Sequence, residues 1–174
     1  MTFARTPAIL LVVALGVAPF MAQAQGGSPA ASTAADTGKS EDFWRLVMSP
    51  YTYHYSNDPD HEPVYAIGLE RQRSDKWYWG ATYFSNSFGQ PSGYVYVGQT
   101  YGNLFSIEPL FAQWSVGLLY GYKDPYEDKV PFNTNGFSPG AVLSLGWRFT
   151  REFSTQLNFL GTAALQFQLS IDFR

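Results

Sequence analysis

The sequence predicts an all-β fold: an eight-stranded antiparallel transmembrane β-barrel with a short N-terminal amphipathic helix. From Leu165 to Phe173, the last strand-length segment, apolar and polar residues alternate at every position. Successive side chains of a β-strand point to opposite faces, so this segment has one apolar face and one polar face. The same alternation recurs upstream and the chain begins with an export signal, a combination typical of an outer-membrane barrel.

The first 40 residues predict an export signal and a linker. Arg5 lies in a short N-terminal region, Ala8 to Phe20 form an apolar run, and Ala22-Gln23-Ala24 fits the small-residue cleavage pattern. The apolar run is shorter than the ~20 residues of a membrane-spanning helix, so we expect a signal peptide over residues 1–24. Residues 25–40 are rich in Gly, Ala, Ser and Thr, which predicts a flexible linker.

Composition limits the partners and the location. The net charge is −3 without a basic cluster, which argues against nucleic acid as a partner. The chain has no cysteine, which excludes disulfides, thiolate nucleophiles and thiolate metal ligands. Aromatic residues make up 18% of the chain, which suits the girdles and the lipid-facing wall of a barrel. We expect residues 41–174 to form one barrel domain in a Gram-negative outer membrane.

The first element of that domain is expected over Glu41 to Met48. Acidic residues open the segment and Phe43, Trp44, Leu46 and Val47 follow, which predicts a short helix lying at a membrane interface. An extension of the first strand is the alternative for the same residues.

Eight strands follow, and each shows its own alternation. In the first, Tyr51, Tyr53 and Tyr55 share one face, and His54 lies on the other; in the fifth, Tyr122 is expected on the apolar face. Alternation alone does not say which face is inside. Because the polar faces carry Gln, Asn, Asp and Arg while the apolar faces are large and aromatic, we expect lipid outside. The predicted strands are 50–56, 63–72, 77–88, 93–102, 112–122, 141–149, 153–160 and 164–173.

Glycines are frequent on the polar, inward face. An eight-stranded barrel has room inside for its own side chains or one small ligand, so small inward residues could leave a slot for an acyl chain. Alternatively, these glycines relieve crowding or allow bends in tightly curved strands. The inward glycines on this register are Gly68, Gly80, Gly98, Gly117, Gly121 and Gly146.

A histidine and a serine are the strongest candidates for chemistry. His54 lies near the end of the first strand on its inward face, and the third strand ends in Tyr83-Phe84-Ser85-Asn86-Ser87-Phe88, which contains two serines. Odd strands end at the same rim, and two inter-strand spacings separate these strands by about 10 Å, so the side chains could converge over the mouth. An imidazole that takes the proton of a hydroxyl is the minimal apparatus for acyl transfer. The alternative is that His54 is a solvated rim residue.

The loop between the first two strands carries a second candidate. Asn57 to Glu62 contains three carboxylates and His61, which could hold a divalent cation through oxygen ligands, although a solvated turn explains the same residues. We therefore expect no metal and no other cofactor.

Three short segments resemble the lipid A palmitoyltransferase (PagP-like) family. Thr52-Tyr53-His54 is similar to the aromatic residue and histidine of that family's first strand, and Phe84-Ser85-Asn86-Ser87-Phe88 stands where its third strand ends. The spacing onward brings Gly98 onto the glycine that forms the floor of the family's acyl-chain pocket. The resemblance spans about residues 41 to 174.

The resemblance implies an N-terminal amphipathic helix, a tilted eight-stranded barrel and transfer of palmitate from a phospholipid to lipid A. It implies that His54 is the general base and Ser87 its hydroxyl partner, with Gly98, Gly68, Gly80 and Gly117 at the acyl-chain pocket. Asn86 stands in place of the family's catalytic Asp, as an orienting or oxyanion-stabilising amide. The first extracellular loop is shorter than the family's, and Asp58 or Asp60 within it could supply the missing charge.

The sequence thus predicts an outer-membrane lipid acyltransferase, with phospholipid, lipopolysaccharide and the outer-membrane assembly machinery as partners. A non-catalytic barrel that binds lipid or stabilises the membrane is the first alternative, favoured by Asn86. A transporter or channel is the second, and the narrow lumen of eight strands argues against it.

Overall fold

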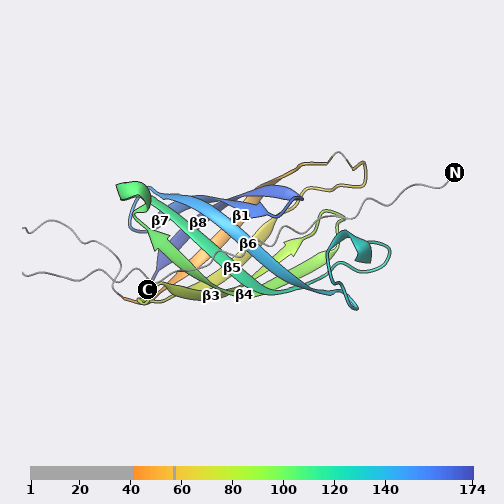
Figure 1. Ribbon diagram of the computed structural model, residues 1–174, viewed down its shortest axis with the longest axis horizontal. Coiled ribbons are helices and arrows are strands. Elements are labelled where there is room, and N and C mark those ends of the chain that lie inside the picture. Colours follow the sequence, from red (N-terminus) through yellow and green to blue (C-terminus); the bar gives the residue numbers. More distant parts are fainter. Residues whose placement is uncertain (1–40, 57) are drawn as a thin grey trace, which may run out of the picture. The chain divides into compact units, whose positions relative to one another are not determined.

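The computed structural model describes residues 41–56 and 58–174, so the expected signal peptide, the expected linker and Asn57 lie outside the described residues. The described chain forms a closed barrel in which each strand pairs antiparallel with its neighbours in sequence, and the first strand pairs with the last (Figure 1). No helix of this part is long and apolar enough to cross a membrane. The strands are β1 (Phe43–His54), β2 (Ala66–Gln72), β3 (Trp77–Ser85), β4 (Pro91–Gly102), β5 (Leu110–Tyr120), β6 (Phe137–Arg148), β7 (Phe153–Leu160) and β8 (Ala164–Phe173), with 3-10 turns η1 (Leu104–Ser106) and η2 (Glu127–Lys129).

The eight predicted strands are confirmed. The bounds of β7 and β8 are those expected, and β2, β3 and β5 end or begin a few residues away from their expected bounds. Loops 55–65, 86–90, 121–136 and 161–163 all lie at the end of the barrel where β1 stops, which we call the His54 rim. The turns 73–76, 103–109 and 149–152 lie at the opposite rim.

The predicted helix over Glu41 to Met48 is wrong, because Phe43 to Met48 form the first half of β1. This half pairs with β8 from Trp44 opposite Phe173 to Met48 opposite Leu169. A helix here would leave that part of β8 with unpaired backbone groups, which a closed barrel does not tolerate. A register shift between Met48 and Tyr51 exchanges the inward and outward positions, and this shift hides the strand alternation in the sequence.

The barrel is apolar outside and polar inside, as the alternation predicted. Val95 and Leu143, in the middle of the wall, are 65% and 63% exposed, whereas the inward Gln156 and Ser170 are buried. Aromatic side chains gather at both ends of the outer wall. Tyr53, Tyr65, Tyr83, Tyr120 and Phe137 are exposed near the His54 rim, and Trp77, Trp79, Trp147, Phe153 and Phe173 near the opposite rim.

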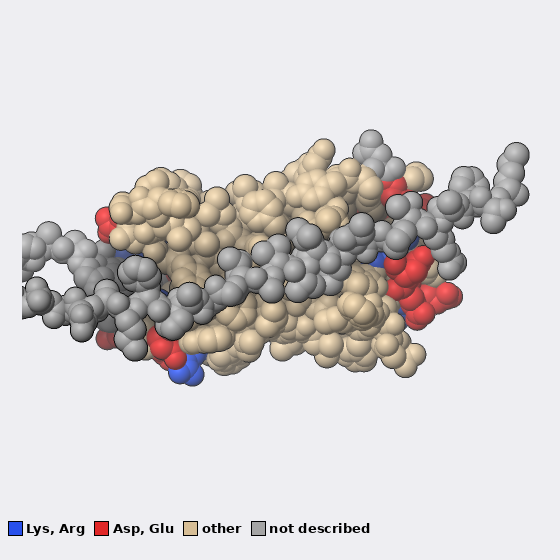
Figure 2. Space-filling model, viewed as in Figure 1, with Lys and Arg blue, Asp and Glu red and all other residues tan. Residues whose placement is uncertain are grey.

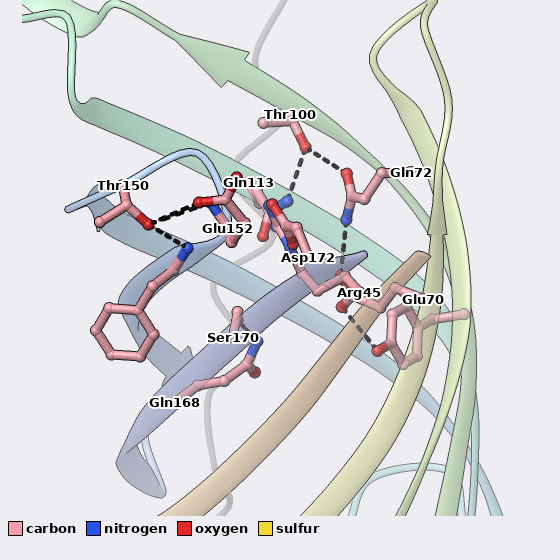
Figure 3. Close-up of polar contacts among 12 residues, drawn as sticks. Arg45, Glu70, Gln72, Thr100, Gln113, Thr150, Glu152, Gln168, Ser170 and Asp172 are labelled. Atoms are coloured by element: carbon pink, nitrogen blue, oxygen red, sulfur yellow. Dashed lines mark hydrogen bonds and ion pairs between the residues drawn. The ribbon is translucent and has the colours of Figure 1, made fainter. Parts of the chain in front are cut away.

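Hydrogen-bonded polar side chains fill the lumen toward the opposite rim (Figure 3). Arg45 and Asp172 form a buried two-point ion pair, with N···O distances of 2.6 and 3.1 Å. Beside it, the Gln113 amide donates to Thr100 at 2.7 Å, and the Gln72 amide donates to the buried carboxylate of Glu70 at 2.7 Å. These contacts lie on the inward faces of β1, β2, β4, β5 and β8 and occupy the space through which a pore would have to pass.

Candidate functional site

His54 and Ser87 meet at the His54 rim, as the sequence predicted. The Nε2 atom of His54 lies 2.7 Å from the Oγ atom of Ser87, although 33 positions separate the two residues in the chain. Both side chains are half-buried. A nucleophile and a base at this distance satisfy the geometric requirement for proton transfer from the hydroxyl to the imidazole.

Asn86 builds the turn that carries Ser87. Its Oδ1 accepts hydrogen bonds from the backbone N–H groups of Phe88 and Gln90, both at 3.0 Å, and its backbone N–H donates to the Gln90 carbonyl at 2.9 Å. The side chain is fully buried, and its Nδ2 points to the Gly121 carbonyl at 3.4 Å. Sequence reasoning gave Asn86 an orienting role toward His54 or an oxyanion; in the structure its amide instead fixes the backbone on either side of Ser87.

His61 is a site residue that sequence reasoning considered only as a metal ligand. Its ring centroid lies 4.3 Å from that of His54, with 38° between the ring planes. The other side of His61 meets the ring of Phe88 edge-on at 5.5 Å. His61 thereby restrains the imidazole of His54 from the side of the first loop, a contact that the spacing of two histidines in a loop does not reveal.

Tyr122 is a second residue that the sequence misplaced. The alternation of β5 predicted an outward side chain, but the strand ends at Tyr120, and Gly121 has a φ of +139°, which interrupts the alternation. Tyr122 is half-buried at Ser87: burial raises the pKa of its phenol, and hydrogen bonding with Ser87 partly offsets that rise. A glycine that interrupts an alternating segment was the available signal for this turn.

The carboxylate of Asp58, in the first loop, is engaged away from His54. Asp58 Oδ2 lies 3.1 Å from the ammonium of Lys129, and Asp58 Oδ1 accepts the backbone N–H of Asp60 at 3.1 Å. These contacts, the backbone hydrogen bond first, hold the pKa of the Asp58 carboxyl below its ordinary value. Within residues 41–56 and 58–174, no three His, Cys, Asp or Glu side chains lie close enough together to hold a metal ion.

The inward glycines lie against side chains and backbone carbonyls of neighbouring strands. A Cβ added at Gly98 would collide with the Trp114 carbonyl and lie 2.7 Å from the Tyr78 ring, and one at Gly80 would lie 3.0 Å from the Tyr96 hydroxyl. A Cβ at Gly117 would lie 2.8 Å from Cβ of Tyr96, one at Gly146 would collide with the Phe111 ring, and one at Gly68 would collide with the Thr82 hydroxyl. Of the two interpretations left open by the sequence, relief of crowding is the one that these contacts favour.

The backbone pairing between β1 and β2 stops before it reaches the site. The last β1–β2 pair joins Ser49 to Ala66, so from Pro50 to His54 the described part of β1 pairs with β8 alone. On the other side, residues 62–65 follow β3: the Glu62 N–H donates to the Ser87 carbonyl at 2.8 Å and the Ser85 N–H to the Tyr65 carbonyl at 3.2 Å. The end of β1 and the segment 62–65 that leads into β2 therefore separate beside the His54 imidazole, at the level of the tyrosine girdle.

This arrangement can move a proton between a hydroxyl and an imidazole at the edge of an apolar wall, which is the chemistry of ester attack and acyl transfer. The third residue of such a site orients the imidazole in other enzymes; here the residue packed on it is His61. No protein-family model matches the chain, and no curated protein matches it either.

Proposed function

We propose that this chain is an outer-membrane lipid acyltransferase, with Ser87 as the reacting hydroxyl and His54 as the general base. The observation that carries the proposal is the 2.7 Å contact between His54 Nε2 and Ser87 Oγ. The substrates are a phospholipid donor and an acceptor of the lipid A type, so lipopolysaccharide is the second lipid partner. The barrel reaches its membrane through a cleaved signal peptide and the outer-membrane assembly machinery.

The outer surface of the barrel supports a membrane location. Large apolar side chains face outward along the strands, and aromatic girdles ring both ends, which is the pattern of a wall that contacts lipid. Tyr53 and Tyr55 flank His54 in sequence and are 55% and 50% exposed. A girdle residue lies at the level of the lipid headgroups, so the candidate site lies at the depth of a phospholipid's ester bonds.

In the proposed reaction one imidazole takes up and returns a proton twice. Ser87 Oγ attacks the donor's ester carbonyl while its proton passes to His54 Nε2; the ester C–O bond breaks, and the leaving lysophospholipid alkoxide takes that proton. The acceptor hydroxyl then gives its proton to Nε2 and attacks the acyl-serine, and Ser87 regains a proton from the imidazolium. The phenol of Tyr122 lies beside Ser87 at this site.

Mass spectrometry of lipid A and phospholipids from cells with and without the protein tests the proposal. We expect an additional acyl chain on the acceptor and an increase in lysophospholipid when the wild type is expressed. Ser87→Ala and His54→Asn should each remove both changes. Ser56→Ala is the matched control, because Ser56 is an exposed serine at the same rim. Identical lipid profiles for wild type and Ser87→Ala would reject the acyltransferase.

A non-catalytic barrel that binds lipid or stabilises the membrane is the second candidate, and the packed glycines favour it over an enzyme with an internal acyl-chain pocket. Tyr78 and Tyr96 lie where a hydrocarbon slot over Gly98 and Gly117 would have to be. The same spectra separate the two candidates, since a binding barrel co-purifies with lipid and leaves the acyl pattern unchanged. A channel has little support, because the Arg45–Asp172 pair and its neighbours fill the lumen.

A further inference from the structure

A lysine ammonium lies between an aromatic ring and a carboxylate near Ser87. The Nζ atom of Lys129, in η2, lies 5.0 Å over the ring of Phe88 and 3.1 Å from Oδ2 of Asp58. Phe88 directly follows Ser87, and Asp58 lies in the loop that leaves His54. The Lys129 ammonium therefore lies against the residue that directly follows Ser87, the candidate reacting residue.

The ring of Phe88 is fixed by other aromatic rings. Tyr126 stacks on it with 4.1 Å between centroids and 13° between planes, and His61 meets it edge-on at 5.5 Å. A fixed aromatic face together with a carboxylate is the pairing by which proteins recognise ammonium groups. Backbone N–H donation from Asp60, with Lys129, keeps the pKa of Asp58 low, so the carboxylate is charged at neutral pH.

The surrounding loops carry more negative than positive charge. Figure 2 shows acidic side chains gathered at the end of the barrel that carries η2. Such a rim attracts an ammonium and repels a headgroup with a net negative charge. Loops 55–65 and 121–136 carry six carboxylates, Asp58, Asp60, Glu62, Asp124, Glu127 and Asp128, and two lysines, Lys123 and Lys129.

We propose that Phe88 and Asp58 form a headgroup site for the ammonium of an ethanolamine phospholipid, and that Lys129 occupies this site while no lipid is bound. The inference rests on the proposed function and names its donor class: a zwitterionic glycerophospholipid with a primary ammonium, in preference to an anionic phosphatidylglycerol. A lipid ammonium that replaces the Lys129 ammonium makes the same two contacts, with the Phe88 ring and the Asp58 carboxylate. The ester bonds of that lipid are then brought toward Ser87.

Binding of short-chain phospholipids to the Ser87→Ala protein, refolded in detergent micelles, tests this site without turnover. Phosphatidylethanolamine should bind about threefold to tenfold more tightly than phosphatidylglycerol with the same acyl chains. Phe88→Leu and Asp58→Asn should each abolish the preference. Lys129→Gln should raise the affinity for phosphatidylethanolamine, because the competing ammonium is gone. Phe132→Leu is the matched control: Phe132 is 75% exposed in the same loop as Lys129, and the preference should survive this change.

Three results would overturn the inference. The first is equal affinity for phosphatidylethanolamine and phosphatidylglycerol, and the second is a preference that survives in both Phe88→Leu and Asp58→Asn. The third is an affinity for soluble glycerophosphoethanolamine equal to that for phosphatidylethanolamine. The last result would mean that the site takes a free amine and not a lipid. A wild type that transfers acyl chains without headgroup preference contradicts this inference alone. A headgroup preference in a protein that transfers no acyl chain contradicts the proposed function alone.

Discussion

Arg45 and Asp172 form a two-point ion pair across the seam where the first strand meets the last. The two side chains are 2% and 4% exposed, and 127 positions separate the residues in the chain. The pair joins β1 to β8 inside the lumen, in the segment where a helix was predicted.

Removing one partner of this buried pair should destabilise the barrel strongly. We expect Asp172→Asn to lower the free energy of unfolding by about 3–5 kcal/mol, because the buried guanidinium of Arg45 loses the carboxylate that forms its two-point ion pair. The Arg73–Asp75 pair has the same two-point geometry but is about half exposed, so Asp75→Asn should cost less than about 1 kcal/mol. Urea unfolding of the refolded proteins in lipid vesicles measures both costs. Equal costs would contradict a stabilising role for the Arg45–Asp172 pair.

A charged substitution on the outward face of the wall should destabilise the barrel only where that face contacts lipid. Leu143, in β6, and Phe132, in loop 121–136, are 63% and 75% exposed. In lipid vesicles we expect Leu143→Arg to cost about 2–4 kcal/mol near mid-membrane, and Phe132→Arg about 0–1 kcal/mol in its loop. Unfolding measurements of the two variants check this difference. If both changes are tolerated, the wall faces water and the membrane location is wrong.

Gly98 should act through packing and not as the floor of an acyl pocket. A Cβ at Gly98 meets the Trp114 carbonyl and the Tyr78 ring, whereas a Cβ at Gly102, on the same strand, meets nothing within 4 Å. Gly98→Ala should therefore cost about 1–3 kcal/mol, and Gly102→Ala almost nothing. Unfolding of both variants tests the difference. A stable Gly98→Met variant that accepts shorter acyl chains would contradict this account and support Gly98 as the floor of an acyl-chain pocket.

The strands, and the approach of His54 to the end of the third strand, could be predicted from the sequence because both depend on local alternation and on where strands end. The choice of Ser87 came from the resemblance to the palmitoyltransferase family. The predicted helix failed because the register shift after Met48 interrupts the alternation and the partner strand lies at the other end of the chain. The sequence could not show that Tyr78 lies against Gly98 and Tyr96 against Gly80 and Gly117, since that depends on the stagger between neighbouring strands. Tyr122 was misplaced because one glycine reversed its face.

Asn86 should stabilise the turn and should not be improved by a carboxylate. Asn86→Ala leaves the half-buried N–H groups of Phe88 and Gln90 without their acceptor, at a cost of about 1–3 kcal/mol. Asn86→Asp keeps that acceptor but sets a second oxygen against the carbonyl of Gly121. We therefore expect Asn86→Asp to leave acyl transfer unchanged or lower in a lipid assay. Increased transfer would mean that this residue reaches the imidazole in the working enzyme.

The most direct test is single-turnover acyl transfer by the purified, refolded barrel with a phospholipid donor and a lipid A acceptor. His54→Asn and Ser87→Ala should each lower the rate by about 10²–10⁴-fold while the barrel stays folded, because general base catalysis is lost. The double variant should be no slower than either single variant, since the two residues act as one unit. Ser56→Ala should transfer at the wild-type rate. Equal rates in wild type, His54→Asn and Ser87→Ala would contradict the assignment of the 2.7 Å pair as the catalytic site.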